Sequence, residues 1–477
     1  MNFALIAYIL GLVLDIEAGC MVLPLICSLI YKENTASMWI ICIAVCLCLG
    51  LPLSLKRPKN RNLFAKEGFA VVALSWIVIS IFGAIPFFIS KSIPNFIDAV
   101  FEIASGFTTT GASILYDIEA LPHSILFWRS FSHWIGGMGV LVFLVALLPK
   151  SGGDNMYLVR AESPGPSVSK LVPKVGVSAK LLYIIYVGIT ALEVVFLLFG
   201  GTSLFESLTM AFGTAGTGGF AVKNTSIAGY SPYIQWVITV FMILFGVDFA
   251  VHYILIKKRF KESPSEEVKV YLTIILAAAT LIIINCSKIY PSISETIRHG
   301  FFQTASIITT TGFSTADFDK WPEFSKAILV ALMFIGACAG STGGGIKVSR
   351  IVILFKSIIK QIQISAHPNR TIKLSMDGRP VEHETLRAVN VFIAAYILIF
   401  VVSVLIISLD NFNFTTNYTA VAATINNIGP GLDKVGPAHN FAEYSNLSKI
   451  VLIGDMLIGR LEIFPFLILF SRKTWKK

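Results

Sequence analysis

The stretch FEIASGFTTTGAS, residues 101–113, decides the fold of this 477-residue chain, because it returns three more times in altered form. The later copies are TMAFGTAGTGGFA (209–221), FFQTASIITTTGFST (301–315) and TAVAATINNIGPGL (419–432). Each copy is too short to cross a bilayer, and apolar runs that approach the ~20 residues of a membrane span flank it on both sides. A unit that recurs in this way predicts a repeat architecture.

The four copies align on one glycine each, at Gly111, Gly219, Gly312 and Gly429, and the three residues before it read TTT, GTG, TTT and NNI. We therefore expect a helix of about ten to fifteen residues that ends just before each glycine. In the first three copies a capping residue stands three positions before an acid, which marks the helix start. These pairs are Asn95 with Asp98, Ser203 with Glu206, and Ser292 with Glu295; the fourth copy lacks the acid, so its start stays undefined.

The composition is that of a membrane protein, with 55% hydrophobic residues, 14% charged residues and a mean hydropathy of +0.76. Soluble domains carry roughly 25% charged residues, so soluble, disordered and secreted disulfide-rich classes are excluded. The expected fold is an all-α polytopic membrane protein in which two N-terminal helices precede four helix, pore-helix loop and helix units around one central pore. The predicted limits are residues 1–60 for the two helices and 61–150, 175–260, 265–360 and 385–477 for the units.

The net charge of +10 follows the membrane topology. Most basic residues lie in five clusters, at Lys56–Lys66, Lys150–Lys180, Lys257–Lys269, Lys347–Arg387 and Arg472–Lys477. Basic loops favour the cytoplasmic side, and one topology, with both termini cytoplasmic, places all five clusters there. The charge therefore does not call for a nucleic-acid partner.

The geometry of four short helices that stop inside a membrane favours a cation, because each directs the partial negative charge of its C-terminus at the centre. Non-helical backbone is tolerated at that depth where it lines a water-filled path, and rings of backbone carbonyls can replace the hydration shell of an alkali cation. The predicted filter comprises each glycine and the two residues before it: Thr109, Thr110, Gly111, Thr217, Gly218, Gly219, Thr310, Thr311, Gly312, Asn427, Ile428 and Gly429.

A second glycine-rich string, at residues 336–345, interrupts the returning half of the third unit. Each glycine costs a helix about 1 kcal/mol relative to alanine, so we expect loose backbone below the filter, with Gly340, Ser341, Thr342, Gly343, Gly344 and Gly345 as gate residues. A phosphate-binding Walker loop is disfavoured, since Ile346 separates Gly345 from Lys347. Arg460, about halfway through the last apolar segment, is a functional candidate because a membrane-embedded arginine is costly; an internal ion pair with Asp455 or Glu462 is the alternative.

The chain resembles the Trk/Ktr/HKT superfamily of potassium transporters, and within it the bacterial TrkH-type subunits. The resemblance rests on motifs in family order: TTTGA from Thr108, FWRSFSHWIGGMGV from Phe127, TGGF from Thr217, TTTGF from Thr309, AGSTGGGIK from Ala339, INNIGPG from Ile425 and MLIGRLEIFP from Met456.

This resemblance implies a potassium uptake pore in the bacterial plasma (inner) membrane, and a homodimer. It also implies gating by a TrkA-type cytosolic subunit, which would carry the nucleotide. It places the filter glycines on Gly111, Gly219, Gly312 and Gly429, and the gate on the glycine string and Arg460. A glycine at Gly111 favours potassium over sodium, whereas the sequence GTG departs from the threonine triplet in the second filter.

Two alternatives stay open. The chain could instead couple potassium to protons or sodium as a symporter, and the basic stretch Lys356–Arg387 could dock a gating ring or simply anchor the topology. An enzyme is not expected, because no GxSxG elbow or ligand motif occurs, and neither is a tightly bound organic cofactor. Arg129 and His133, near the outer end of a return span, are interpreted as residues that stabilise the filter.

Overall fold

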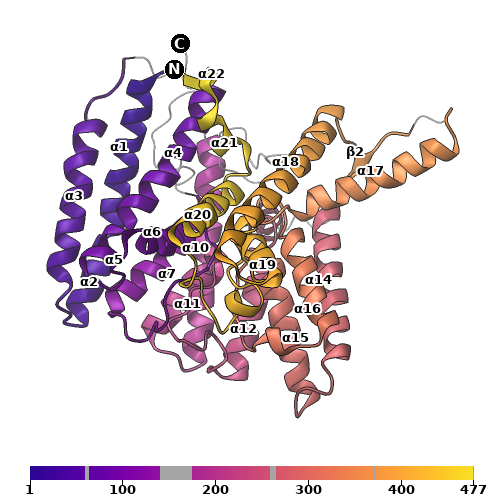
Figure 1. The fold of residues 1–477 in the computed structure, drawn as a ribbon, viewed down its shortest axis with the longest axis horizontal. Coiled ribbons are helices and arrows are strands. Elements are labelled where there is room, and N and C mark those ends of the chain that lie inside the picture. Colours follow the sequence, from indigo (N-terminus) through magenta and orange to yellow (C-terminus); the bar gives the residue numbers. More distant parts are fainter. Residues whose placement is uncertain (60–63, 140–174, 258–264, 370–371, 476–477) are drawn as a thin grey trace.

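The computed structural model describes residues 1–59, 64–139, 175–257, 265–369 and 372–475, which are mostly helical (Figure 1). The N-terminal part contains α1 (Phe3–Cys20), α2 (Val22–Ile30) and α3 (Ala36–Ser54). α1 and α3 pack along each other at one side of the molecule, as Figure 1 shows in indigo. These helices correspond to the two opening spans expected from the sequence.

After this pair, the same order of elements occurs four times: a long helix, a short helix that ends at a glycine-centred loop, and a second short helix. The long helices are α4 (Ala65–Gly83), α10 (Val175–Phe199), α14 (Glu266–Asn285) and α18 (His383–Ile407). The short helices before the glycines are α6 (Phe96–Phe107), α11 (Leu204–Gly216), α15 (Ile293–Ile308) and α19 (Phe414–Ile425). The return helices are α7 (His123–Met138), α12 (Pro232–Phe245), α16 (Glu323–Ile335) and α20 (Asn446–Arg460).

Each of the first three short helices begins where the sequence predicts. The side chains of Asn95, Ser203 and Ser292 accept hydrogen bonds from the first turns of α6, α11 and α15, and Ser203 forms a complete capping box. The fourth start, which the sequence leaves undefined, lies at Asn413, whose side chain accepts from the amide of Thr416. Asparagine therefore caps this helix without the acid three positions later.

All four return helices stop before they could cross a bilayer. α7 ends at Met138, α12 bends by 98° into α13 (Phe249–Ile256), and α20 ends at Arg460, ahead of α21 (Phe464–Leu467). Between α16 and α17 (Val348–Ala366) lies the glycine-rich loop, residues 336–347. An apolar return span was expected in every unit, and the breaks after α12 and α20 correct that expectation for units two and four; the continuation of α7 lies outside the described residues. Arg460 accordingly lies at the end of a helix rather than midway along one.

Among the described residues, six helical segments are long and apolar enough to span a membrane, and the bent α12–α13 pair would be a seventh. The six are Phe3–Ile30, Ala36–Ser54, Lys66–Ile89, Ala179–Phe199, Glu266–Asn285 and His383–Asp410. They are the N-terminal pair and the first helix of each unit. The chain is therefore a multi-pass membrane protein, and the expected all-α fold is confirmed.

The remaining elements of the described chain are short. They are α5 (Ile85–Ile89), η1 (Phe318–Lys320), η2 (Ser408–Asp410), η3 (Asp433–Val435), η4 (Ile468–Phe470), α22 (Arg472–Trp475) and an antiparallel pair, β1 (Ser375–Met376) with β2 (Arg379–Pro380). α17 and the β1–β2 hairpin project away from the body, and the two termini lie close together at one end (Figure 1).

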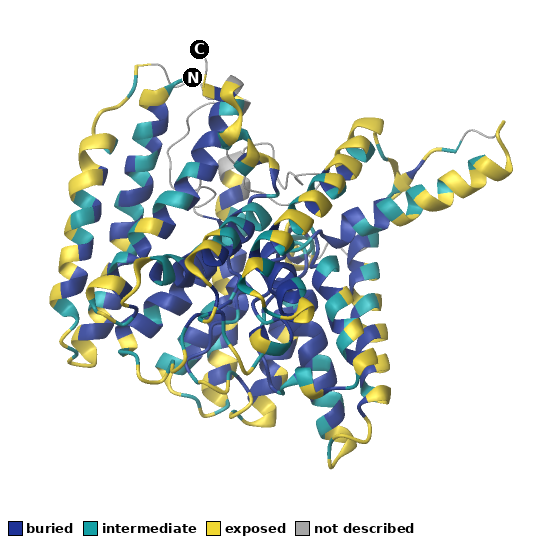
Figure 2. Ribbon diagram, viewed as in Figure 1, coloured by how far each residue is buried: buried dark blue, intermediate teal, exposed yellow. Residues whose placement is uncertain are grey.

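Burial separates the layers. The last six residues of α6, α15 and α19 are all buried, while α3, α14 and α18 expose large apolar side chains on their outer faces (Figure 2). An exposed apolar belt around a buried, threonine-rich centre is the arrangement expected of a protein that faces lipid and surrounds a polar path. The predicted unit limits stay predictions; those at residues 61, 150, 260 and 477, and most of the cluster Lys150–Lys180, lie outside the described residues.

Candidate functional site

The four short helices end in the same backbone motif. Two positions before each glycine, a non-glycine residue adopts the left-handed conformation: Thr109, Thr217, Thr310 and Asn427, with φ between 54° and 59°. The amide of the next residue returns to a carbonyl of the helix at 2.8 Å in all four cases: Thr110 to Ser105, Gly218 to Gly213, Thr311 to Ser306 and Ile428 to Ala423. This is the Schellman helix end, so the chain leaves each helix in the same direction.

A left-handed threonine is strained, because a β-branched side chain crowds the backbone there. Three of the four positions nevertheless carry threonine. Such strain persists only where the surroundings over-determine the conformation, and it concentrates at functional sites.

The four glycines form a closed ring of contacts between units. A Cβ added to Gly111 would overlap the carbonyl oxygen of Gly218, one on Gly219 that of Thr311, and one on Gly312 that of Ile428. The ring closes because a Cβ on Gly429 would crowd the carbonyl of Thr110. Each glycine thus lies against the carbonyl that precedes the glycine of the next unit, in the order one, two, three, four and back to one.

All four glycines also have φ between 73° and 101°, a region that favours glycine. Glycine is therefore required twice at these positions, by conformation and by the neighbouring carbonyl. Together the four line a cavity of about 210 Å³, whose remaining walls are the loop residues that follow them and Arg129 of α7. The residues that the sequence predicts for the filter are thus brought together in one place.

The threonines of the first and third loops support this backbone through their hydroxyls. Thr108 Oγ1 donates to the Ala104 carbonyl at 2.6 Å and lies 2.8 Å from Thr110 Oγ1; Thr309 and Thr311 repeat the pattern at 2.7 Å and 2.7 Å. In the fourth loop the side-chain amide of Asn426 donates to the Ala422 carbonyl instead, at 2.9 Å. Asparagine and threonine make the same bond to the helix, which explains how asparagine can stand at the first position of the triplet.

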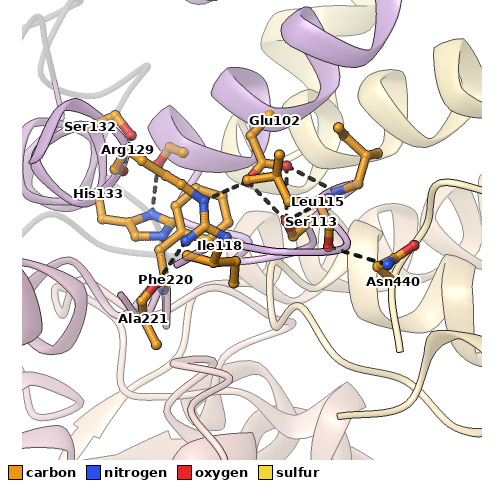
Figure 3. A network of polar contacts seen from close by, with 12 residues as sticks. Glu102, Ser113, Leu115, Ile118, Arg129, Ser132, His133, Phe220, Ala221 and Asn440 are labelled. Carbon is orange, nitrogen blue, oxygen red and sulfur yellow. Dashed lines mark hydrogen bonds and ion pairs between the residues drawn. The ribbon is translucent and has the colours of Figure 1, made fainter. Parts of the chain in front are cut away.

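The second loop reads GTG because a histidine from α7 occupies the space that threonine side chains would need. A Cβ on Gly216 or Gly218 would overlap His133. The His133 ring contacts the carbonyl of Gly106 through Nδ1 at 2.8 Å and the amide of Phe220 through Nε2 at 3.2 Å. A carbonyl can only accept and an amide can only donate, so His133 is the neutral Nδ1–H tautomer, and it bridges the first two units (Figure 3).

A buried ion pair joins the same two units. Arg129 Nε lies 2.6 Å from Glu102 Oε1, and its Nη1 donates to the Ala221 carbonyl at 2.9 Å. Glu102 in turn accepts from the amide of Ile114 at 2.9 Å and from the hydroxyl of Ser113 (Figure 3). The carboxylate thus holds the strand after Gly111, and the guanidinium holds the strand after Gly219, as the filter-stabilising interpretation of Arg129 and His133 requires.

The glycine-rich loop contacts residues that precede the ring glycines of the third and fourth loops. The Gly344 amide donates to Thr310 Oγ1 at 2.6 Å, and the hydroxyl of Thr342 donates to the Phe245 carbonyl at 3.3 Å. A Cβ on Gly344 would lie 2.5 Å from the Asn426 carbonyl oxygen. Loose backbone was expected here, but the loop is fixed by these contacts to the third loop, to α12 and to the fourth loop.

Two cations contact consecutive carbonyls of this loop. Arg460 Nη1 donates to the Thr342 carbonyl at 2.9 Å, and the buried ammonium of Lys347 donates to the Gly343 carbonyl. Arg460 also donates to the Gly136 and Gly137 carbonyls at the end of α7. The acids considered as its alternative partners bind elsewhere, since Glu462 pairs with Arg350 and Asp455 accepts from Ser403 at 2.7 Å.

Sequence reasoning missed Lys347 and the carboxylate of Glu267, which accepts from the Ala339 amide at 2.7 Å and the Ser349 amide at 2.9 Å. Lys347 stands two residues after the last glycine of the string, and a lysine inside an apolar region is itself a signal. Glu267 carries no such signal, because it stands 72 residues before Ala339 and no local sequence pattern links the two.

The fold and the ring define a membrane transport protein built around one central path. The profile of the TrkH family, described as a cation transport protein, matches residues 34–477, and the chain belongs to this family. The membership confirms the expected resemblance and the expectation that the chain is not an enzyme.

Relatives match over the whole length. The Trk system potassium uptake protein TrkH of Salmonella typhimurium is 37% identical over 100% of both chains, and its Vibrio parahaemolyticus counterpart is 34% identical over 100% of both. The crystal structure of the potassium transporter TrkH from Vibrio parahaemolyticus superimposes with a TM-score of 0.88 at 32% identity and covers 100% of both chains.

Proposed function

We propose that this protein takes up potassium through a filter formed by the four glycine-centred loops. The single observation that carries the proposal is the closed ring, in which each glycine lies against the carbonyl before the glycine of the next unit. The filter consists of Thr109, Thr110, Gly111, Thr217, Gly218, Gly219, Thr310, Thr311, Gly312, Asn427, Ile428 and Gly429. The potassium named in the titles of the relatives supports this choice of ion.

The chemistry follows from the backbone. Carbonyl oxygens held at fixed positions replace the water that a potassium ion loses on entry. The C-termini of α6, α11, α15 and α19 add partial negative charge beneath the ring, which lowers the energy of a cation there. Potassium is the transported substrate, and the proposal needs no bound organic cofactor.

The gate in this proposal is the glycine-rich loop, with residues Gly340–Gly345, together with Arg460. The loop lies against the inner side of the third and fourth filter strands. Arg460, held on the Thr342 carbonyl, opposes the passage of a cation by its charge. Opening then requires the loop to leave these contacts.

The proposal extends to partners and location. A TrkA-type cytosolic subunit that carries a nucleotide gates the pore, and the projecting α17 and hairpin are its proposed docking surface. The protein is a homodimer in the bacterial inner membrane, with both termini cytoplasmic. The shared end of the two termini in Figure 1 and the basic clusters support this orientation.

The filter is tested by the substitution Gly111→Ser. The added Cβ meets the Gly218 carbonyl, so this carbonyl must move away and the ring loses its fit to potassium. We expect discrimination between potassium and sodium to fall by roughly tenfold, the equivalent of about 1.4 kcal/mol, in uptake by cells that lack other potassium transporters. Gly454→Ser is the matched control, because a Cβ at Gly454 meets no atom within 4 Å. Unchanged discrimination in a well-expressed Gly111→Ser protein would sink the proposal.

A further inference from the structure

The two ends of the glycine-rich loop meet at residues 337–339 and 348–349, which we call the loop neck. One side chain from a distant helix binds this neck. The loop leaves α16 and returns at α17, and its two ends meet where the Val348 amide donates to the Ala337 carbonyl at 3.1 Å. Beside this contact, Oε1 of Glu267 accepts from the amides of Ala339, on the loop side, and Ser349, on the α17 side, at 2.7 Å and 2.9 Å. A single carboxylate oxygen therefore bridges both ends of the loop.

The chemistry of this contact favours an acid. Ser349 lies in the first turn of α17, where backbone amides have no partner within the helix and the helix dipole attracts negative charge. The N-cap of α17 is Lys347, whose side chain caps no amide of the helix. Glu267, 7% exposed, supplies the missing acceptor from the first turn of α14.

We propose that Glu267 is a positioning residue for the glycine-rich loop: its carboxylate keeps the loop neck closed and thereby holds the tip against the filter. The role of the loop in gating rests on the proposed function, whereas the positioning of the loop does not. The tip contacts, from Gly344 to Thr310 and from Arg460 to Thr342, persist only while the neck keeps its place.

A natural reporter of loop position is Cys338, the residue next to Ala339. It is fully buried, and its amide donates to the Gly246 carbonyl at 3.1 Å. The rate at which N-ethylmaleimide alkylates this thiol in the full-length protein in lipid vesicles measures how often the loop opens. Peptide mass spectrometry separates Cys338 from the other six cysteines.

The decisive comparison is Glu267→Ala with Glu267→Gln. Both substitutions remove the negative charge, so any change in the ionisation of the Cys338 thiol is common to them. Only glutamine keeps an oxygen at the position that accepts both amides. We expect the alanine variant to raise Cys338 labelling on the order of tenfold or more, as two lost hydrogen bonds to a charged acceptor imply. The glutamine variant should raise labelling clearly less than alanine does, because its oxygen still accepts both amides although it is a weaker acceptor than a carboxylate.

The control is Glu266→Ala. Glu266 is the neighbouring acid and pairs with Lys356 on α17, away from the loop, so its removal should leave Cys338 labelling unchanged. If Glu267→Ala does not accumulate in the membrane, Glu267→Asp carries the test, because a side chain one methylene shorter cannot reach both amides. Labelling of the alanine and aspartate variants at the wild-type rate would overturn the proposal.

Potassium flux measured in the same vesicles distinguishes the positioning role of Glu267 from the role of the loop as a gate. Faster labelling together with faster flux supports both the positioning role and the loop as gate. Faster labelling with unchanged flux supports the positioning role and shows that the gate assignment in the proposed function is wrong.

Discussion

Lys347 is the residue whose role the fold changes most. Lys347 is 1% exposed, and its ammonium donates to the Gly343 carbonyl. The preceding carbonyl, of Thr342, accepts from Arg460. Two cations therefore lie next to each other beneath the ring of glycines. If potassium passes here, as the proposed function requires, the ion meets the repulsion of both charges at a dielectric well below that of water.

Lys347→Met keeps the length of the side chain and removes the charge. We expect the basal potassium flux, measured without any cytosolic partner in lipid vesicles, to rise roughly tenfold, which corresponds to a barrier lower by about 1.4 kcal/mol. Arg460→Met should raise it similarly, and the double variant further. Lys347→Arg, which retains the charge, is the control; if it conducts as freely as the methionine variant, the charge is not the barrier.

At the scale of elements, the Glu102–Arg129 pair joins α6 of the first unit to α7 and reaches the strand of the second. Both side chains are at most 2% exposed. Removing one partner of such a pair leaves a buried charge uncompensated, whereas removing both often costs little. The pair therefore provides a stability test of the contact between the two units.

We expect Glu102→Gln to lower the free energy of unfolding by about 3–5 kcal/mol, measured by thermal unfolding in detergent, and the double variant Glu102→Leu with Arg129→Met to recover most of it. The matched control is Glu443→Gln, which breaks the half-exposed pair with Lys434 and should cost about 0–1 kcal/mol. If Glu102→Gln lowers the free energy of unfolding by no more than the control does, the pair does not stabilise the contact between the two units.

The side-chain contacts at the start of α19 predict a pH dependence of stability. The carboxylate of Asp433 accepts from the hydroxyl of Thr416 at 2.6 Å and from the side-chain amide of Asn413. These hydrogen bonds hold the pKa of this carboxyl below its ordinary value, and the bond from Thr416 has the larger effect. A lowered pKa in the folded state means that the carboxylate stabilises the fold above the ordinary pKa of about 3.9. This contribution is lost as the pH falls through the lowered value.

Asp433→Asn should therefore lower the melting temperature by the same amount at pH 7 and at pH 5, and the difference from the wild type should vanish only below about pH 4. Glu443→Gln, at an exposed site, should show no such change. A difference that disappears between pH 7 and pH 5 would be inconsistent with the lowered pKa.

At the scale of the whole molecule, α17 and the hairpin extend from the body (Figure 1). Three exposed basic residues lie on or near the hairpin: Lys373 just before β1, Arg379 in β2 and Arg387 near the start of α18. If this is the docking surface for a gating subunit, reversing the three charges to glutamate should abolish co-purification with that subunit at low salt. Lys320→Glu, in a connector on the filter side and 82% exposed, should leave co-purification intact. Equal recovery of the subunit by both variants would assign the basic stretch to topology alone.

The features that could be predicted from the sequence are those written in local patterns. The glycine alignment, the caps at Asn95, Ser203 and Ser292, and the polytopic class each depend on residues a few positions apart, and the structure places them as expected. The pattern GTG looked irregular from the sequence alone. Its reason is His133, which lies more than eighty residues away in the chain and fills the space beside the second loop.

The same limit applies to strain and to the gate. Threonine is a poor candidate for left-handed backbone, so the positive φ of Thr109, Thr217 and Thr310 could not be read from their identity. The break after α12 is marked only by the single Gly246, and the one after α20 only by Pro465 at the start of α21, so neither could be predicted with its position from the sequence. Glu267 is found only when the fold brings α14 to the loop neck.

Because a single polypeptide contributes all four strands of the glycine ring, each strand has its own codon and occurs once per molecule. A substitution in a pore of four identical chains enters at four places together, whereas here it alters one quarter of the ring. Serine introduced in turn at Gly111, Gly219, Gly312 and Gly429 should therefore produce four distinct phenotypes, graded by the neighbouring carbonyl that each Cβ meets. Natural selection can likewise change one strand of the ring at a time, so that ion preference shifts without four simultaneous substitutions.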